Sequence, residues 1–340
     1  NGFIGHLTYW GRRGGFMSAV YGQSRFGEWR RRHSGMIQPP VLAHALEELW
    51  LQTGDSKLLA TYLPRVRAFY DWLSRERDTD GSGLIGIVSP YEAGTDNNPS
   101  FDAALGVSNP GRMRILWENR KLDWYNIIRG KNFDYRTLIK RDRFVVIDPF
   151  MNAVYADAWS TLSRMHKANG DSEAAIIAGE QAAKTTASLN ERCWDSERGH
   201  YTYLHGADQH PDTTLSVGAI FPLILQGTPK DRIAGVMERY VTNPDHFWRP
   251  FPVPSVAASE NSYDAESEAM IWRGPICMNL NWLLARGFKS HGYLDEAKVI
   301  SERSKEAAFK DFREFYSPET GRGMRGTRFG WATAAVAIDA

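Results

Sequence analysis

The chain has 340 residues, of which 42% are hydrophobic, enough for one large core or two ordinary domains. Its 41 basic and 40 acidic residues give a formal charge of +1, which argues against a nucleic-acid-binding surface, because such a surface needs a clear basic excess. No run of 18 apolar residues occurs, so we expect no membrane-spanning helix.

Most of the chain is predicted to be helical. Apolar side chains recur at helical spacing after the prolines at residue 39, and Gly54 is a typical helix end. Ser172 is a typical N-cap for another such segment. Helices are predicted over 39–55, 56–78, 149–171, 172–195, 213–225, 229–241, 268–288 and 293–312. Strand-like alternation is confined to 143–148 and 199–206.

Several of these helices are joined by very short turns that carry Gly and Asp. The chain therefore resembles a series of helical hairpins, but the spacing is too irregular for a solenoid repeat. Helical hairpins separated by long, aromatic-rich loops predict a closed ring of helix pairs, with the loops gathered at one end to build a site. No linker or break in composition occurs, so we predict a single domain over residues 1–340.

The stretch YEAGTDNNPSFD, residues 91–102, is the first candidate site because it places three acids in twelve residues. In a pocket, repulsion and desolvation among Glu92, Asp96 and Asp102 raise the pKa of at least one of them. A carboxylic acid that stays protonated near neutral pH is what a general acid requires. Composition alone favours a solvated loop over a site.

A second acidic stretch runs from 311 to 333 and contains Glu314, flanked by Arg313 and Phe315. A neighbouring arginine keeps a carboxylate ionised, as a general base requires; the alternative is an ordinary glutamate on a helix surface. A third stretch contains Trp272 and Arg273 directly before Gly-Pro. The proline breaks an apolar helix there and directs both side chains toward a cavity, unless they are a core Trp and a structural Arg.

The beginning of the chain is loop-like and supplies Tyr9 and Gln38. A glutamine just before a helix can donate to and accept from a sugar hydroxyl. His6 and His33 have no metal-ligand spacing, and the two cysteines, at 193 and 277, have no CxxC spacing, so neither a metal nor a cofactor is predicted. The low cysteine content and the absence of an Asn-x-Ser/Thr acceptor lead us to expect a cytoplasmic protein.

Taken together, these stretches resemble the (α/α)6-barrel glycoside hydrolases of family 63, within it the compact mannosylglycerate and glucosylglycerate hydrolases, and more distantly trehalases and glucoamylases. The likeness spans nearly the whole chain and depends on the order of the motifs. They are GFIGHLTYW, QPPVLAHALEELW, SPYEAGTDNNPSFD, VIDPFMNAVYADAW, EAMIWRGPICMNLNWLL and EFYSPETGRGMRGTRFGWATA. The resemblance implies an all-α (α/α)6 toroid with long loops at one end.

The resemblance also implies a role for individual residues. Asp96 corresponds to the family's general acid and Glu314 to its general base, which together act as an inverting α-glycosidase on a small α-glucoside or α-mannoside. The other residues that correspond to substrate-binding positions are Tyr9, Gln38, Glu92, Gly94, Asn97, Trp272, Arg273 and Trp331. A small carbohydrate is the expected partner, nucleic acid and membrane are not, and a homo-oligomer stays open.

The sequence differs from the family pattern in three places. The Trp-Asp pair of the family's first helices is not found, so we expect the chain to begin after those helices. Cys277 stands where the family often has a second Trp, and residues 104–143, which are basic and aromatic, do not align. These departures favour an alternative, a non-catalytic sugar-binding barrel or inactive homologue. An epimerase or a polysaccharide lyase is a third interpretation and needs a His or Tyr base in the cleft.

Overall fold

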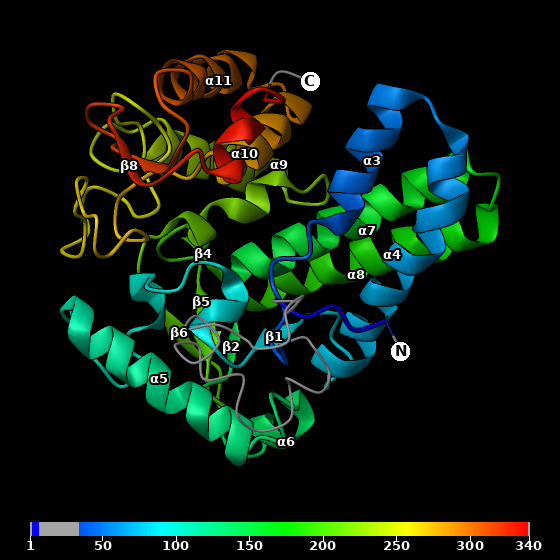
Figure 1. Cartoon of the computed structure of the whole chain (residues 1–340), viewed down its shortest axis with the longest axis horizontal. Coiled ribbons are helices and arrows are strands. Elements are labelled where there is room, and N and C mark those ends of the chain that lie inside the picture. Colours follow the sequence, from blue (N-terminus) through cyan, green and yellow to red (C-terminus); the bar gives the residue numbers. More distant parts are fainter. Residues whose placement is uncertain (1, 7–33, 339–340) are drawn as a thin grey trace. The chain divides into compact units, whose positions relative to one another are not determined.

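The computed structural model describes residues 2–6 and 34–338 (Figure 1). The chain divides into two compact units. Unit 1 consists of Asn1–Asp96, Ala103–Arg192 and Leu204–Pro211, and unit 2 consists of Asn97–Asp102, Cys193–Tyr203 and Asp212–Ala340. The single domain expected over the whole chain stays a prediction. Across the described residues, no helix is both long and apolar enough to span a bilayer.

Unit 1 is built mainly from helices. They are α3 (Leu42–Thr53), α4 (Ser56–Arg77), α5 (Arg112–Ile128), α6 (Tyr135–Ile139), α7 (Pro149–Ala168) and α8 (Ser172–Arg192). Helices α7 and α8 run side by side (Figure 1) and share the most extensive contact of the unit. The helices predicted over 39–78 and 149–195 are therefore confirmed, whereas α5 and α6 lie in the segment that the sequence left unassigned.

The ends of these helices follow from local chemistry. Gly54 adopts φ +65°, and its N–H donates to the Trp50 carbonyl at 2.8 Å, which ends α3. The side chain of Asp55 then accepts from the Lys57 N–H and starts α4. Asp148 caps α7 in the same way, with Pro149 in the first turn. One or two residues at each of these helix ends thus determine where the helix stops or starts.

The core of unit 1 lies between α4 and α7. Tyr70, Tyr155 and Trp159 form an aromatic cluster with ring centroids 5.7 to 6.2 Å apart, and all three are buried. One small antiparallel sheet, ordered β1–β2–β5–β6, belongs largely to this unit. Its strands are β1 (Gly86–Ile87), β2 (Val146–Ile147), β5 (Tyr203–His205) and β6 (His210–Asp212), with Gly86 opposite Ile147.

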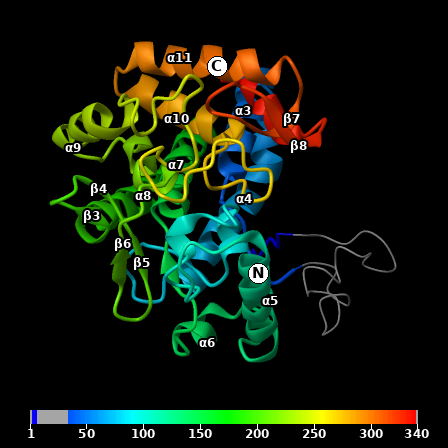
Figure 2. The same cartoon turned by 90° about the vertical axis from the view of Figure 1, so that its left-hand side faces the viewer.

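Two of the helices of unit 2 and one of its hairpins pack around a second core. Its helices are α9 (Lys230–Val236), α10 (Met278–Ser290) and α11 (Leu294–Ala308), and Figure 2 shows α10 beside α11. The hairpins are β3 (Trp194–Asp195) with β4 (His200–Tyr201), and β7 (Arg313–Tyr316) with β8 (Gly323–Thr327). Short 3-10 turns are η3 (Val217–Ala219), η4 (Phe221–Ile224) and η6 (Gly330–Ala335), and η5 (Met237–Val241) is a π turn after α9.

Two predicted helices of unit 2 are wrong in part. The segment 213–225 forms two short 3-10 turns, and the helix predicted from 268 begins only at Met278. Both segments are apolar and buried, but Pro222 and Pro275 remove backbone donors and prevent a continuous helix. The η4 turn lies against α10 so closely that a Cβ on Gly287 would come within 2.7 Å of Ile224.

Asn152 on α7 provides a test of the core of unit 1. Its amide accepts from the Ile85 N–H at 2.7 Å and donates to the Ile85 carbonyl at 2.9 Å, and the residue is fully buried. Asn152→Ala leaves both backbone groups unpaired, so we expect the free energy of unfolding to fall by about 2–4 kcal/mol. Ser160→Ala on the same helix is the control, with a change of about 0.5 kcal/mol or less in urea unfolding. Equal urea midpoints for Asn152→Ala and Ser160→Ala contradict a stabilising role of the Asn152 hydrogen bonds.

Candidate active site

The segment that precedes Asp96 is held by a buried ion pair in unit 1. Arg77, the last residue of α4, donates from Nη1 to Glu92 Oε2 at 2.7 Å and from Nη2 to Oε1 at 2.6 Å. The same two oxygens accept from the backbone N–H groups of Ile37 and Val88 at 3.1 and 2.9 Å. Both side chains are essentially inaccessible to solvent. Glu92 therefore joins three segments of the chain through four hydrogen bonds.

Gly94 and Gln38 lie beside each other in the same unit. Gly94 ends the 3-10 turn η1 (Pro90–Ala93) at φ +68°, a conformation that favours glycine. A Cβ there would lie 3.4 Å from Gln38 Oε1, and Gln38 Nε2 donates to the Tyr91 carbonyl. This hydrogen bond from the Gln38 side chain to the backbone brings the predicted glutamine and the predicted acid motif together.

Asp96 itself is half-buried, and its carbonyl accepts from Asn119 Nδ2 at 3.4 Å. Asn119 belongs to α5, which contributes two further polar contacts to the same segment. Ser89 Oγ donates to Asp123 Oδ1 at 3.1 Å, and Asn126 Nδ2 donates to the Val88 carbonyl at 2.7 Å. These α5 residues are functional candidates that the sequence analysis missed.

Asp123 is the most perturbed acid near this segment. Burial raises its pKa to about 8, against the lowering effects of the Ser89 hydroxyl and of Arg120. The neighbouring charges of Glu92 and Asp96 raise the pKa further. Asp123 is therefore mainly protonated at neutral pH.

The segment that follows Asp96 is held by a second buried ion pair, in unit 2. Arg273 Nη2 donates to Asp102 Oδ1 at 2.6 Å, and both residues are buried. Burial raises the pKa of Asp102, and Arg273 opposes that shift. The Nε and Nη1 groups of Arg273 are also buried and have no hydrogen-bond partner among the described residues. Two nitrogens of this arginine are therefore left without a hydrogen bond among the described residues.

Asn97 and Trp272 meet in the same unit. The backbone N–H of Trp272 donates to Asn97 Oδ1 at 3.0 Å. The Trp272 ring packs edge-on against Phe315, with centroids 5.0 Å apart. The next glycine, Gly274, adopts φ +153°, and a Cβ there would lie only 2.4 Å from the Asp264 carbonyl oxygen. Close backbone approach thus fixes the Trp-Arg-Gly-Pro segment.

Glu314 lies on β7, next to Phe315. Its side chain is 23% exposed, and Oε2 accepts from the Gly326 N–H at 3.4 Å and lies 3.7 Å from Arg325 Nε. The neighbouring cation is therefore Arg325 on β8, whereas Arg313 pairs with Asp311. A partly solvated carboxylate beside a guanidinium is suited to accept a proton from water.

The hairpin that carries Glu314 is fixed by further ion pairs within unit 2. Arg249 donates to both oxygens of Glu319 at 2.8 and 2.9 Å, and the Tyr263 hydroxyl donates to the same carboxylate at 2.7 Å. Arg322 binds Glu266 at 2.7 and 3.0 Å. These contacts tie the irregular segment 249–268 to the β7–β8 hairpin.

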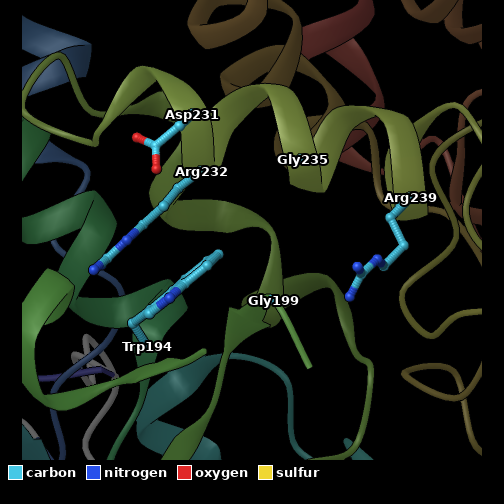
Figure 3. Close-up of a pocket in the computed structure, with 6 residues that line it drawn as sticks. All are labelled: Trp194, Gly199, Asp231, Arg232, Gly235 and Arg239. Carbon is cyan, nitrogen blue, oxygen red and sulfur yellow. The ribbon is translucent and has the colours of Figure 1, made fainter. Parts of the chain in front are cut away.

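Two cavities are described, and neither contains Asp96 or Glu314. One, of about 280 Å³ in unit 2, is lined by Trp194, Gly199, Asp231, Arg232, Gly235 and Arg239 (Figure 3). The Arg232 guanidinium lies 4.5 Å from the Trp194 ring centroid, so one face of that ring is already covered. The other cavity, of about 480 Å³ in unit 1, adjoins Arg77 and Tyr135.

The remaining predictions have the following outcomes. Tyr9 and His33 lie outside the described residues. Trp331 is on η6, and the residue is 50% exposed. In the described part of the chain, no group of three or more His, Cys, Asp or Glu side chains is arranged to hold a metal ion. Asp96 and Glu314 belong to different units, and their facing each other stays a prediction.

Comparison with known proteins identifies the family. Residues 1–332 match the sequence profile described as the mannosylglycerate hydrolase MGH1-like glycoside hydrolase domain. The chain belongs to this family. It is a glycoside hydrolase, as the resemblance predicted.

Individual relatives agree with this. A mannosylglycerate hydrolase from Rubrobacter radiotolerans is 28% identical, over 91% of this chain and 74% of the relative. A glucosylglycerate hydrolase from Mycolicibacterium hassiacum is 22% identical, over 90% and 75%. The crystal structure of a GH63 mannosylglycerate hydrolase from Thermus thermophilus in complex with Tris matches with a TM-score of 0.83 and 25% identity, over 99% of this chain and 84% of that one. The helix-rich fold is that of these hydrolases.

The Arg77–Glu92 pair is testable by a double-mutant cycle. Arg77→Met and Glu92→Gln each leave one buried partner uncompensated, so we expect each to lower the free energy of unfolding by about 3–5 kcal/mol. The double variant has neither charge and should lose clearly less than the sum. Arg303→Met removes an exposed pair with Glu306 and should cost about 1 kcal/mol or less. If the double variant loses as much free energy of unfolding as the two single variants together, measured by chemical denaturation, the two side chains are not coupled.

Proposed function

We propose that the protein is an inverting α-glycosidase with an (α/α)6 toroid, and that it hydrolyses a small α-mannoside or α-glucoside of an acidic aglycone such as glycerate. Asp96 is the general acid and Glu314 the general base. The observation that carries the proposal is the pair of buried salt bridges, Arg77–Glu92 and Arg273–Asp102, that fix the chain on either side of Asp96.

The chemistry needs two carboxyl groups and one water. The Asp96 carboxyl donates its proton to the glycosidic oxygen, and the bond from that oxygen to the anomeric carbon breaks. Glu314 accepts a proton from the water that attacks the anomeric carbon on the opposite face, so the configuration inverts. Such enzymes hold the two carboxyl groups roughly 6.5 to 9.5 Å apart, which leaves room for the water.

The surroundings of Glu314 support its role as the base. Its carboxylate keeps partial solvent access, so a water can reach it, and the Arg325 guanidinium lies beside it. The turn of its hairpin is tied to segment 249–268, because Arg249 and Tyr263 bind Glu319 and Arg322 binds Glu266. A base that is fixed before the substrate binds lowers the reorganisation needed in the transition state.

Arg273 supports the choice of an acidic aglycone. Its unpaired Nε and Nη1 donors are buried, and a buried donor without a partner is costly unless a ligand completes it. Mannosylglycerate and glucosylglycerate, the compounds in the names of the relatives, both carry a carboxylate. A charge-assisted hydrogen bond from one of these N–H groups to a ligand carboxylate is short and strong.

Replacement of the two proposed catalytic acids tests the mechanism. Asp96→Asn and Glu314→Gln should each lower kcat by roughly 100-fold or more, because each removes one proton transfer. Asp55→Asn and Glu302→Gln, exposed positions in units 1 and 2, are the matched controls and should keep normal turnover. The assay is proton NMR of mannosylglycerate and glucosylglycerate hydrolysis, in which the first sugar released should have the β configuration. Release of the α anomer first, or near-normal turnover in either catalytic variant, refutes the mechanism.

A substrate comparison tests Arg273. Arg273→Lys should lower kcat/KM for mannosylglycerate roughly 10- to 100-fold more than for the uncharged mannosylglycerol, because only the first substrate loses a charge-assisted hydrogen bond from the guanidinium to its carboxylate. A general effect of the substitution on the Asp102 segment lowers kcat/KM for both substrates alike, so it cancels in the ratio of the two kcat/KM values. An equal loss for both substrates excludes Arg273 as the carboxylate contact.

A further inference from the structure

Helix α5 has an unusual distribution of side chains. Its buried positions include Asn119, Asp123 and Asn126, whereas large apolar side chains, Met113 and Trp117 among them, are exposed. Burial of polar groups is unfavourable unless each has a partner. The three buried residues are spaced i, i+4 and i+7 and lie on one face of the helix.

All three polar residues contact the same segment. Asn126 binds the Val88 carbonyl, Asp123 binds the Ser89 hydroxyl and Asn119 binds the Asp96 carbonyl. The C-terminal end of α5 binds the beginning of segment 88–96, and its middle binds the end of that segment. Helix α5 therefore holds both ends of segment 88–96.

We propose that Asp123 is a positioning residue of the reaction: through Ser89, and together with its helix neighbours Asn119 and Asn126, it fixes the backbone of residues 88–96 and thereby places the Asp96 carboxyl. The inference rests on the proposed function only where it refers to catalysis by Asp96. Asp123 does not touch the substrate, and it acts through the segment that it holds.

The protonation of Asp123 fits this role. The charged groups around it are Arg120 on α5 itself and Glu92 and Asp96 on the segment that it holds, and Glu92 is already paired with Arg77. A neutral Asp123 accepts the Ser89 hydrogen bond without adding a third negative charge. Because its folded pKa of about 8 exceeds the unfolded value of 3.8, the folded protein holds a proton that the unfolded chain releases. Stability from this group is therefore full below pH 4 and is lost as the pH rises toward 8.

Three variants and a control test the proposal. Asp123→Asn keeps an acceptor for Ser89 and removes the titration. Asp123→Leu removes the acceptor, and Ser89→Ala removes the donor. Asp55→Asn, at the exposed N-cap of α4 in the same unit, is the matched control. Each is measured for Tm from pH 5 to 8, for kcat and KM from pH 6 to 10, and for amide hydrogen exchange at residues 88–96.

The expected results separate positioning from a merely structural role. Asp123→Asn should keep kcat at pH 7, extend the alkaline limb of the kcat profile beyond that of the unmodified protein, and gain Tm relative to it as the pH rises from 5 to 8. Asp123→Leu should lower kcat roughly 10- to 100-fold with little change in KM, and it should accelerate exchange at residues 88–96. Ser89→Ala should accelerate exchange at the same residues, and Asp55→Asn should change neither that exchange, nor kcat, nor the dependence of Tm on pH.

Two results overturn the inference. One is a Tm difference between Asp123→Asn and the unmodified protein that does not change with pH. The other is unchanged exchange at residues 88–96 in both Asp123→Leu and Ser89→Ala. Neither readout needs a substrate. If Asp96→Asn stays active while Asp123→Leu accelerates exchange, the proposed acid is wrong and the positioning of the segment stands. If Asp123→Leu does not fold, Asp123→Asn and Ser89→Ala decide the question.

Discussion

The buried salt bridge between Arg77 and Glu92 is the constraint on which the proposed acid depends. Removal of two charges from water is costly, and such a pair gives little net stability compared with apolar packing. Its benefit is specificity, because Glu92 accepts from four donors on three segments and has one arrangement that satisfies them all. The end of α4, the segment before Gln38 and the turn before Asp96 are therefore fixed together.

The polar face of α5 adds a second set of contacts to the same segment. Arg77 holds the turn through Glu92, whereas Asp123 and its neighbours hold the backbone at residues 88, 89 and 96. In unit 2 the Arg273–Asp102 pair and the Trp272–Asn97 contact hold the residues that follow. Asp96 thus lies in a stretch whose backbone is bound on both sides, as the placement of a general acid requires.

The sequence predicted those features that local signals encode, and it failed where tertiary contacts decide. Helices α3, α4, α7 and α8 follow from apolar spacing, from Gly54 and from the short turns that carry Gly and Asp. Helix α5 was missed because its inner face is polar, although the spacing of Asn119, Asp123 and Asn126 is a signal that could have found it. Arg313 was expected beside Glu314, but consecutive strand residues point to opposite faces, so the cation comes from Arg325 on the paired strand.

The central claim is that Asp96 and Glu314 act from opposite sides of one anomeric carbon. A crystal structure of the Glu314→Gln variant with bound mannosylglycerate or glucosylglycerate tests it most directly. The account predicts that the Asp96 carboxyl lies within hydrogen-bond distance of the glycosidic oxygen, and that the side chain at 314 is roughly 6.5 to 9.5 Å from it, across an ordered water. A sugar bound elsewhere, or an Asp96 side chain directed away from the glycosidic oxygen, contradicts the account.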